Sequence, residues 1–311
     1  GTAAYCVGDI DNPGYDLDNN DTLVHPKRIL IEASNGASDY GNKIGEPIIQ
    51  GFARSFGQNL NGERIEWLKP IMFTGGVGLV SHDLLTKNNP ESGMKIVRLG
   101  GPAYRIGVGG GSASSRDQDN KNKEIDLNAV QRGDPEMENR VYHVIKRLVE
   151  NPDKCIVQSM HDQGAGGIGN VVKEIVYPSG GSVDLRNLSC GDNTMTSLEL
   201  WTAEFQESMV LLINENDLNI VYKICKDENV PCDILGTVDN SGYIKVFDSR
   251  GDVCERASGH VSKHECAHAV VNLDLDKVLG KVPRKTYNLE SPKDLVEGNG
   301  ARPGIADFLI K

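Results

Sequence analysis

Short apolar runs, each ended by glycine, asparagine or charged residues, recur along the chain and predict a mixed α/β protein. The opening 30 residues are interpreted as a polar loop, and residues 29–41 as a short strand that leads into a glycine and asparagine turn. Residues 48–58 have a helical pattern, and residues 61–67 are interpreted as a solvated loop. Further strands are predicted at residues 70–75, 94–100, 155–160, 208–213, 232–238 and 243–247.

The clearest helix is predicted to begin at Pro135, because Asp134 is a natural N-cap and proline suits the first helical position. Its apolar residues recur every three or four positions and share one face: Met137, Val141, Val144, Ile145, Leu148 and Val149. A second amphipathic helix is predicted from the shared face of Leu218, Val221, Ile224 and Cys225. The pattern gives two α/β units that join near residues 85–92, with a polar tail or linker after Pro283.

Composition and charge narrow the function classes. The 311 residues suffice for two domains with cores, and the net charge of −11 without a basic stripe argues against a nucleic-acid partner. No apolar run approaches the roughly 20 residues of a membrane span, and the first residues lack the pattern of a signal peptide. The seven cysteines, an odd number without a CxxC spacing, favour reduced thiols and a cytoplasmic protein.

The segment HDQGAGGIGNVVKEI, residues 161–175, contains four glycines within six positions, behind a predicted strand and before a predicted helix. The strand would deliver Asp162 to its end, and the helix would begin with free N–H groups that face the same space. A carboxylate in that position can hold Mg²⁺, and Mg²⁺ can hold phosphates. The alternative is a tight turn in which Asp162 only caps the helix, and the spacing alone does not separate the two.

A second glycine cluster, GGPAYRIGVGGGSASS, occupies residues 100–115. It matches neither the phosphate-binding pattern that ends in GK[ST] nor a clear dinucleotide fingerprint. Taken alone it could be a bend or bulge between strands. Two such clusters in one chain favour a pocket for an anionic ligand, since glycine loops and helix N-termini can hold phosphate without a basic surface.

Three further groups of polar residues have open interpretations. Gln131 could donate or accept hydrogen bonds to a ligand, or lie in a surface loop. The residues Glu199, Glu204, Gln206 and Glu207 flank an apolar strand and are either solvated or used in a site. His260, His264 and His268 recur every fourth residue, with Cys266 among them; a solvated turn is favoured over a zinc site, because the segment is a weak helix former.

Six segments occur in one order and close together: IEASNGASDYGNKIGEPIIQGFARSFG, KPIMFTGGVG, RLGGPAYRIGVGGGSASS, AVQRGDPEMENR, HDQGAGGIGNVVKEIV and LELWTAEFQESM. With them the chain resembles, from Gly1 to about Tyr287, the large multidomain formylglycinamide ribonucleotide amidotransferases, also called phosphoribosylformylglycinamidine synthases. The resemblance implies an ATP-dependent ligase of purine biosynthesis. Formylglycinamide ribonucleotide, ATP and glutamine would give the amidine, ADP, phosphate and glutamate through an iminophosphate, with ammonia from a glutaminase domain.

The resemblance also implies an α/β (α+β) fold of two domains of the aminoimidazole-ribonucleotide-synthetase-like type, the first of them incomplete. Residues 1–90 would be the C-terminal part of the first synthetase domain, residues 91–285 its partner domain, and residues 286–311 a tail or linker. Such domains work by pseudo-twofold pairing, so the remainder of the synthetase is an expected partner. Neither nucleic acid nor a membrane is an expected partner.

Functional residues follow from the same resemblance, position by position. Asp162 matches an aspartate that binds Mg²⁺, and Gln131 matches a glutamine that binds substrate. Glu204, Phe205 and Gln206 match a substrate-binding stretch whose middle residue is serine in the short form of the family, so any contact from Phe205 would come through its backbone. Gln50, Gly51 and Phe52 match a nucleotide-contacting stretch. ATP is thus expected as substrate and Mg²⁺ as cofactor.

Two motifs of that family are missing here: the ETHNHP-like segment with the catalytic histidine, and the GEIRD-type segment that contacts phosphate and Mg²⁺. No residue of this chain is therefore assigned as catalytic. We expect an excerpt of the synthetase region that has no turnover by itself. Two alternatives remain: a related kinase-like or synthetase-like enzyme of the same superfamily, and a non-catalytic nucleotide-binding or scaffold protein that kept the fold.

Overall fold

The computed structural model describes residues 1–16, 23–113, 129, 133–151, 154–205, 207–250, 269–281 and 283–288. The chain divides into two compact units, Gly1–Gly280 and Lys281–Lys311. The described residues of the second unit carry no helix or strand. Within the described part of the chain, no helix combines the length and the apolarity needed to cross a bilayer.

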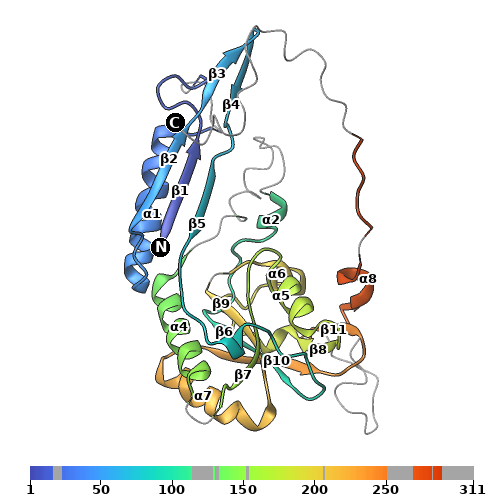
Figure 1. The fold of residues 1–311 in the computed structure, drawn as a ribbon. Helices are drawn as coiled ribbons and strands as arrows, with labels where there is room; N and C mark the ends of the chain where they lie inside the picture. The colour runs from blue at the N-terminus through green and yellow to red at the C-terminus, as the bar shows by residue number, and fades with distance from the viewer. Residues whose placement is uncertain are drawn as a thin grey trace. The chain divides into compact units, whose positions relative to one another are not determined.

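A mixed seven-stranded sheet forms the larger half of the first unit (Figure 1). Its strand order is β12-β11-β8-β10-β6-β9-β7. The strands are β6 (Lys95–Gly100), β7 (Val157–Asp162), β8 (Gly181–Asp184), β9 (Ser208–Ile213), β10 (Cys232–Val238), β11 (Tyr243–Phe247) and β12 (Val271–Asp274). β9 lies between β6 and β7 and pairs antiparallel with both.

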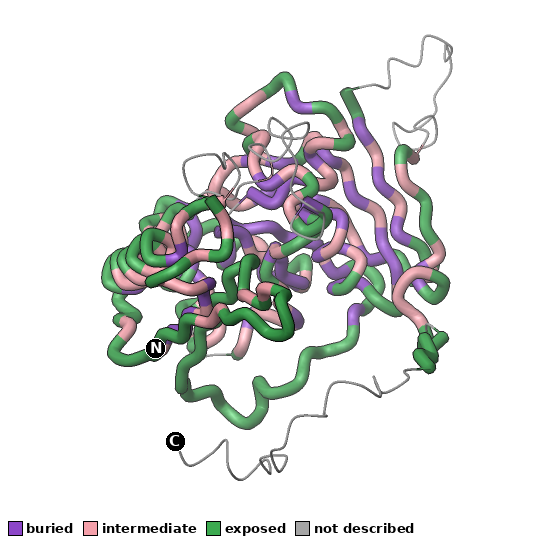
Figure 2. The backbone as a smooth tube through the Cα atoms, turned by 90° about the horizontal axis from the view of Figure 1, so that it is seen from above, coloured by how far each residue is buried: buried purple, intermediate pink, exposed green. Residues whose placement is uncertain are grey.

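Helices cover both faces of this sheet, and the strands between them are the most buried part of the chain (Figure 2). The helices are α4 (Pro135–Val149), α5 (Gly167–Val176), α6 (Ser197–Thr202), α7 (Leu218–Asp227) and the short α8 (Leu275–Leu279). Alternate residues of β9 serve two separate cores. Val210 and Leu212 pack with α5 and α6, whereas Leu211 and Ile213 pack with α4 and α7. This alternation is the strand period of two residues.

A second, three-stranded sheet lies earlier in the chain. Its central strand β1 (Thr2–Val7) pairs parallel with β2 (Gln50–Ser55) and antiparallel with β5 (Ile71–Gly75). The helix α1 (Pro26–Ile44) packs along β1 and also contacts α4. The remaining elements are the hairpin β3 (Gly57–Leu60) and β4 (Glu63–Glu66), the short helix α2 (Gly110–Ala113), and the 3₁₀ turns η1 (His82–Leu84), η3 (Leu185–Asn187) and η4 (Glu215–Asp217).

Several predictions for the first 70 residues were wrong. Residues 29–41 form most of α1 and not a strand, although the helix has recognisable ends. His25 caps its N-terminus through a bond from the Lys27 N–H, Pro26 is its first residue, and Gly45 ends it with a φ of 83°. The polar opening segment contains β1, in which Ala3, Ala4, Tyr5 and Val7 are buried.

The predicted helix at residues 48–58 is in fact β2 and the start of β3. β2 forms because it pairs parallel with β1, and the sequence of residues 50–55 alone does not indicate that pairing. The predicted loop at residues 61–67 belongs to the β3–β4 hairpin. Asn61 and Gly62 have φ values of 49° and 85°, as a two-residue hairpin turn requires, and Asn-Gly is a strong sequence signal for such a turn.

The predictions beyond residue 70 agree much better with the structure. β5 ends at Gly75 as expected, β6, β9, β10 and β11 lie where the apolar runs placed them, and β7 lies two residues later than the run at 155–160. α4 begins at Pro135, and the Asp134 side chain accepts a hydrogen bond from the Met137 N–H at 3.0 Å. The two sheets lie within residues 2–75 and 95–274, but the first compact unit includes both, so the domain boundary at residue 90 stays a prediction.

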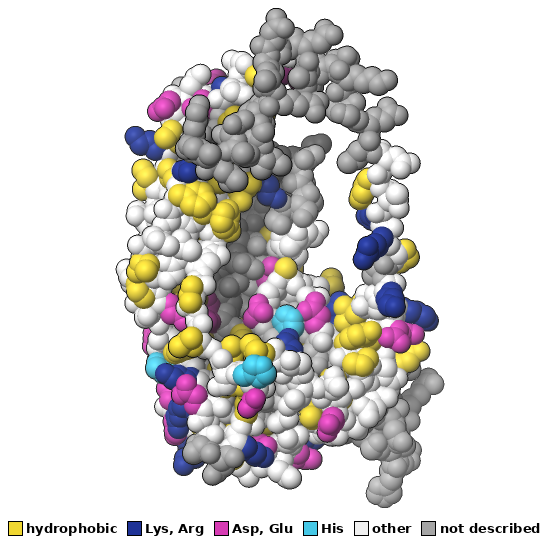
Figure 3. Space-filling model, viewed as in Figure 1, with side chains coloured by type: hydrophobic (Ala, Val, Ile, Leu, Met, Phe, Trp, Pro, Cys, Tyr) yellow, Lys and Arg dark blue, Asp and Glu magenta, His cyan; other side chains and the backbone are white. Residues whose placement is uncertain are grey.

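Apolar side chains remain exposed on the three-stranded sheet and gather over it in Figure 3. Phe52 of β2 and Phe73 of β5 lie edge to face with ring centroids 6.1 Å apart, and the Arg54 guanidinium lies 5.1 Å from the Phe52 centroid. The exposed set on these strands and the following segment includes Ile71, Met72, Val77, Leu79 and Val80. A surface of this kind usually marks an interaction site.

Candidate functional site

The glycine-rich segment after β7 forms the turn that the sequence predicts. β7 ends at Asp162, and α5 begins at Gly167 after the N-cap Gly166, whose φ is 83°. Gly167 also has a positive φ, and a Cβ atom there would lie 2.3 Å from the Ala203 carbonyl oxygen. Glycine is therefore required at residue 167, because α5 begins directly against the end of α6.

Glu204 joins the two glycine clusters. Its carboxylate oxygen Oε1 accepts hydrogen bonds from the Gly166 N–H at 2.8 Å and from the Gly111 N–H at 3.1 Å. Glu204 is only 3% exposed, and added Cβ atoms at Gly107 or Gly110 would collide with its side chain. A buried carboxylate that accepts backbone N–H groups is well stabilised. The two clusters, about 55 residues apart along the chain, thus share one anchor.

Arg105 fixes the first glycine cluster from its other side. Its guanidinium donates to Glu199 Oε1 at 2.6 Å and to Asp192 Oδ2 at 2.7 Å. Glu199 also completes a capping box with Thr196 at the start of α6. The hydrogen bond from Arg105, followed by the Thr196 backbone N–H, lowers the pKa of Glu199 to about 2.

Replacing Arg105 with glutamine is expected to flatten the pH dependence of stability between about pH 4.5 and pH 2. A carboxyl whose folded pKa is lowered contributes stability that is complete above its unfolded pKa and is lost as the pH falls towards its folded pKa. For Glu199 these limits are 4.5 and about 2. Urea midpoints of the variant and the wild type, measured along this range, should therefore converge on acidification.

The matched control for this experiment is Arg28→Gln, which removes an exposed ion pair with Glu32 on α1. Such pairs contribute little, so the control should keep the wild-type pH profile. An Arg105→Gln variant that also keeps the wild-type profile would show that Arg105 does not stabilise the Glu199 carboxylate.

Phe205 is buried, and its ring lies 4.9 Å from the guanidinium carbon of Arg98. Its carbonyl oxygen accepts a hydrogen bond from Gln163 Nε2 at 3.2 Å. The phenyl ring is therefore part of the packing around Arg98, and a ligand could meet this residue only through its backbone.

Asp162, the predicted metal ligand, has a side chain that is 77% exposed. The neighbouring His161 lies with Nδ1 3.5 Å from Asp162 Oδ1 and with Nε2 2.5 Å from Glu174 Oε2. Among the residues that the structure describes, no group of three His, Cys, Asp or Glu side chains is arranged to hold a metal. Mg²⁺ is commonly held by one or two carboxylates together with phosphates and water, so an exposed single carboxylate fits that ion.

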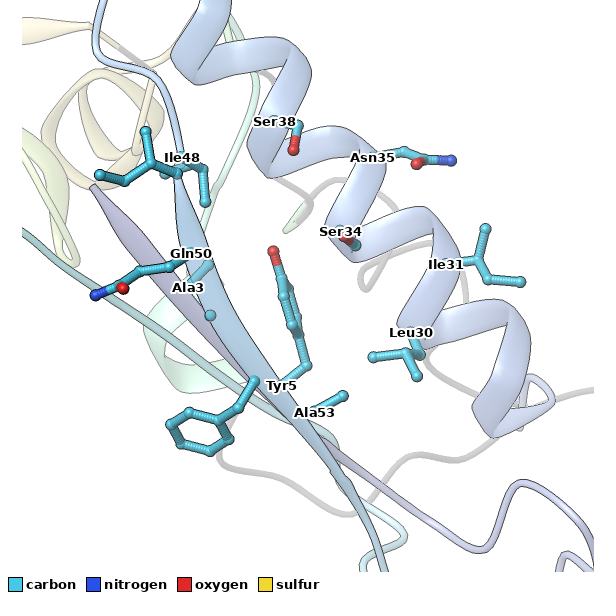
Figure 4. Close-up of a pocket in the computed structure, with 13 residues that line it drawn as sticks. Ala3, Tyr5, Leu30, Ile31, Ser34, Asn35, Ser38, Ile48, Gln50 and Ala53 are labelled. Atoms are coloured by element: carbon cyan, nitrogen blue, oxygen red, sulfur yellow. The ribbon is translucent and has the colours of Figure 1, made fainter.

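Gln50, Gly51 and Phe52, the predicted nucleotide contacts, line a cavity of about 550 Å³ between α1 and the strands β1 and β2. Figure 4 shows the Tyr5 ring pointing into the space between strand and helix, with Ser34 and Ser38 of α1 opposite. The structure thus brings these three residues together in one pocket. Gln131, Gln206 and the histidines at positions 260, 264 and 268 lie outside the described residues.

Residues 91–249 match the protein-family model described as AIR synthase related protein, C-terminal domain. This match covers more than half of the chain. The chain belongs to that family. The membership agrees with the α/β topology of the seven-stranded sheet, which lies mostly within the matched residues.

Two curated relatives of this AIR synthase related chain are named as synthases. It is 45% identical over 98% of its length to the probable phosphoribosylformylglycinamidine synthase, chloroplastic/mitochondrial, of Arabidopsis thaliana. It is 42% identical over 98% of its length to the phosphoribosylformylglycinamidine synthase of Homo sapiens. These matches cover 22% and 24% of the two relatives, so the chain spans less than a quarter of their length.

Solved structures show the same fold at lower identity. Thermotoga maritima PurL complexed with FGAR aligns with a TM-score of 0.65 at 20% identity, over 97% of this chain and 43% of that one. The same protein complexed with ATP aligns with a TM-score of 0.62 at 19% identity, over 97% and 41%. The predicted aminoimidazole-ribonucleotide-synthetase-like α/β fold is thereby confirmed.

The sequence analysis did not identify two residues that hold the site of this AIR synthase related chain in place, Arg98 and Tyr40. Arg98 is fully buried, and a charged residue inside the apolar run KIVRLG was the available signal. Tyr40 donates a hydrogen bond to Glu207 Oε1 at 2.5 Å across 167 residues of sequence, and nothing in its local segment indicates that contact. Burial raises the pKa of both members of this pair.

Proposed function

We propose that this chain acts as part of a phosphoribosylformylglycinamidine synthase. The complete enzyme would convert formylglycinamide ribonucleotide, ATP and glutamine to formylglycinamidine ribonucleotide, ADP, phosphate and glutamate through an iminophosphate. The identity to synthases over nearly the whole chain supports this proposal. The chain would supply part of the ribonucleotide and phosphate site, and other parts of the enzyme would supply the catalytic histidine and the ammonia.

The observation that carries the proposal is the junction of both glycine clusters at Glu204, in the turn that follows the exposed carboxylate of Asp162. Asp162 Oδ2 lies 3.6 Å from the place that a Cβ atom of Gly164 would occupy, so the carboxylate lies against the glycine turn. Such a turn lets a ligand approach the backbone closely, and the start of α5 favours negative charge. Because Glu204 already accepts the N–H groups of Gly111 and Gly166, phosphate oxygens would approach the rest of the turn and a cation held by Asp162.

Asp162 would hold Mg²⁺, which when bound neutralises phosphate charge. Glu204 would belong to the substrate-binding stretch and would also fix the N–H groups of Gly111 and Gly166. Phe205 would act through its backbone, and Gln131 and Gln206 would donate or accept hydrogen bonds to the ribonucleotide. Gln50, Gly51 and Phe52 would contact a nucleotide in the cavity beside α1.

The remainder of the synthetase would be the main protein partner. The exposed apolar side chains of β2 and β5 support this proposal, because a surface with several aromatic and aliphatic residues is costly to leave in water. Ammonia would come from a glutaminase domain. A cytoplasmic location is consistent with the free thiols at Cys6, Cys155, Cys190, Cys225 and Cys232.

The proposed function is tested by comparing this 311-residue chain with the complete synthetase that contains it. The complete enzyme is expected to form amidine from formylglycinamide ribonucleotide, ATP and an ammonium salt, whereas the chain alone is expected to form none above background. The reason is that the chain lacks the ETHNHP-like segment. Product would be followed by mass spectrometry, with ADP release as a second readout.

Either of two results would contradict the proposal. A complete enzyme that releases ADP without forming amidine would favour a related kinase-like enzyme. A natural gene product that ends near the bounds of this chain, binds nucleotide and forms no product would favour the scaffold protein. Amidine formation by the 311-residue chain itself would refute the expected dependence on the missing histidine segment.

A further inference from the structure

The turn between α6 and β9 has a backbone conformation that needs outside support. It contains the predicted substrate-binding residues Glu204 and Phe205 and ends at Glu207, which has a φ of 52° and is only 7% exposed. For a residue with a side chain, this left-handed conformation costs about 1–2 kcal/mol. Contacts from other elements must therefore hold Glu207 in place.

Two elements, α1 and β6, supply three such contacts. From α1, the Tyr40 hydroxyl donates to Glu207 Oε1 at 2.5 Å. From β6, Gly100 approaches so closely that a Cβ atom there would lie 2.0 Å from the Glu207 carbonyl oxygen. Also from β6, Arg98 Nε donates to the hydroxyl of Ser208, the next residue, at 2.9 Å. Among the described residues before residue 90, Tyr40 is the one that hydrogen-bonds to the Glu207 side chain.

Negative charges surround the Glu207 carboxylate, and the hydrogen bond from the Tyr40 hydroxyl helps to keep that carboxylate in place. The negative charges of Asp134 and Glu138, at the start of α4, and the charge of the Glu207 carboxylate repel one another. The Asp134 backbone N–H also donates to the carboxylate and favours its present position. The second oxygen of the Glu207 carboxylate, Oε2, is buried and accepts no hydrogen bond from the residues that the structure describes. Without the hydrogen bond from Tyr40, two effects would favour a move of the Glu207 side chain towards water: repulsion from Asp134 and Glu138, and the buried Oε2 that accepts no hydrogen bond.

We propose that Tyr40 is a positioning residue for the ribonucleotide site, and that it holds Glu204 and Phe205 in their binding conformation through Glu207. The inference rests on the proposed function. It adds a role for α1, the helix that also lines the cavity with Gln50 through Ser34 and Ser38. One helix would then support both the nucleotide pocket and the substrate turn.

The test is Tyr40→Phe in the complete synthetase, which removes one hydroxyl and keeps the ring. A hydrogen bond to a charged group is lost, so KM for formylglycinamide ribonucleotide is expected to rise about 10-fold or more. KM for ATP and kcat at saturating ribonucleotide are expected to change less than about 3-fold. A purely structural loss would lower the amount of active enzyme, and therefore kcat, without raising KM.

The matched control is Tyr142→Phe. Tyr142 lies exposed on α4 and makes an edge contact with His143, so the same change there should leave both KM values unaltered. If Tyr40→Phe has the wild-type KM for the ribonucleotide while the wild-type enzyme forms amidine, the positioning role is wrong and the proposed function stands. If the wild-type enzyme forms no amidine, both proposals fall.

A double-mutant cycle with Glu207→Gly tests whether Tyr40 acts through Glu207. Glycine adopts the left-handed conformation without cost but has no carboxylate to anchor. Glu207→Gly alone is expected to raise KM for the ribonucleotide, and adding Tyr40→Phe should then change KM less than about 2-fold. Fully multiplicative effects of the two substitutions would overturn the proposed route through Glu207.

Discussion

Replacing Arg98 with methionine is expected to lower the free energy of unfolding of this chain by about 3–5 kcal/mol, because breaking a buried ion pair leaves an uncompensated charge. Arg98 is fully buried, and its Nη1 donates to Asp233 Oδ2 at 3.1 Å. Asp233 would keep its bonds from the Ser189 N–H and hydroxyl but would lose its cation. The measurement is urea unfolding of the 311-residue chain followed by circular dichroism.

Two further variants show whether the buried charge is the cause. Combining Arg98→Met with Asp233→Asn removes the stranded carboxylate and is expected to recover part of the loss. Arg147→Met is the matched control, since Arg147 forms ion pairs with Asp227 and Glu228 at the surface. Its loss should cost less than about 1 kcal/mol. A similarly small loss for Arg98→Met would contradict the structural role of the buried guanidinium.

Replacing Asp162 with asparagine in the complete synthetase is expected to lower kcat/KM about 100-fold at limiting Mg²⁺. The substitution keeps the shape of the side chain and removes its charge, and a metal that stabilises phosphate charge contributes several kcal/mol. Because the Asp162 side chain is 77% exposed, folding should be unaffected, which a thermal melt can verify. Activity would be measured along a Mg²⁺ titration, and the variant should need more Mg²⁺ than the wild type.

Asp227→Asn provides the control for this experiment. Asp227 lies on the surface of α7 and pairs with Arg147, so the same loss of charge there should leave the Mg²⁺ titration unchanged. An Asp162→Asn enzyme with near-normal turnover at limiting Mg²⁺ would remove Asp162 from the metal site. The proposal that the glycine turn holds a cation and phosphate together would then fail with it.

Local patterns were sufficient to predict most of the seven-stranded sheet. The runs at β6 and β9 are largely apolar on both faces because helices cover both sides of the sheet, and each run is bounded by a glycine or polar residue. The start of α4 was predicted from Asp134 and Pro135, which act within one helical turn. The position of Asp162 at the tip of a strand was predicted for the same reason, since only adjacent segments determine it.

The predictions failed where a segment depends on a distant partner. All side chains of β2 are exposed, so the strand is stabilised by its pairing with β1. In the sequence, the whole of α1 separates these two strands. α1 contains many small and polar residues, and it is stabilised by packing along β1 and against α4. Propensity is a weak guide for such elements, because tertiary packing overrides it.

The sequence by itself determined the fold class, the strand that delivers Asp162, the glycine turn behind it and the resemblance to a synthase family. Only the tertiary structure decided how the site is held together. Glu204 meets N–H groups 38 and 93 residues away, Arg98 meets Asp233 across 135 residues, and Tyr40 meets Glu207 across 167. Such contacts have no local signature, because burial and hydrogen bonding bring these side chains together only when both sheets and their helices are in place.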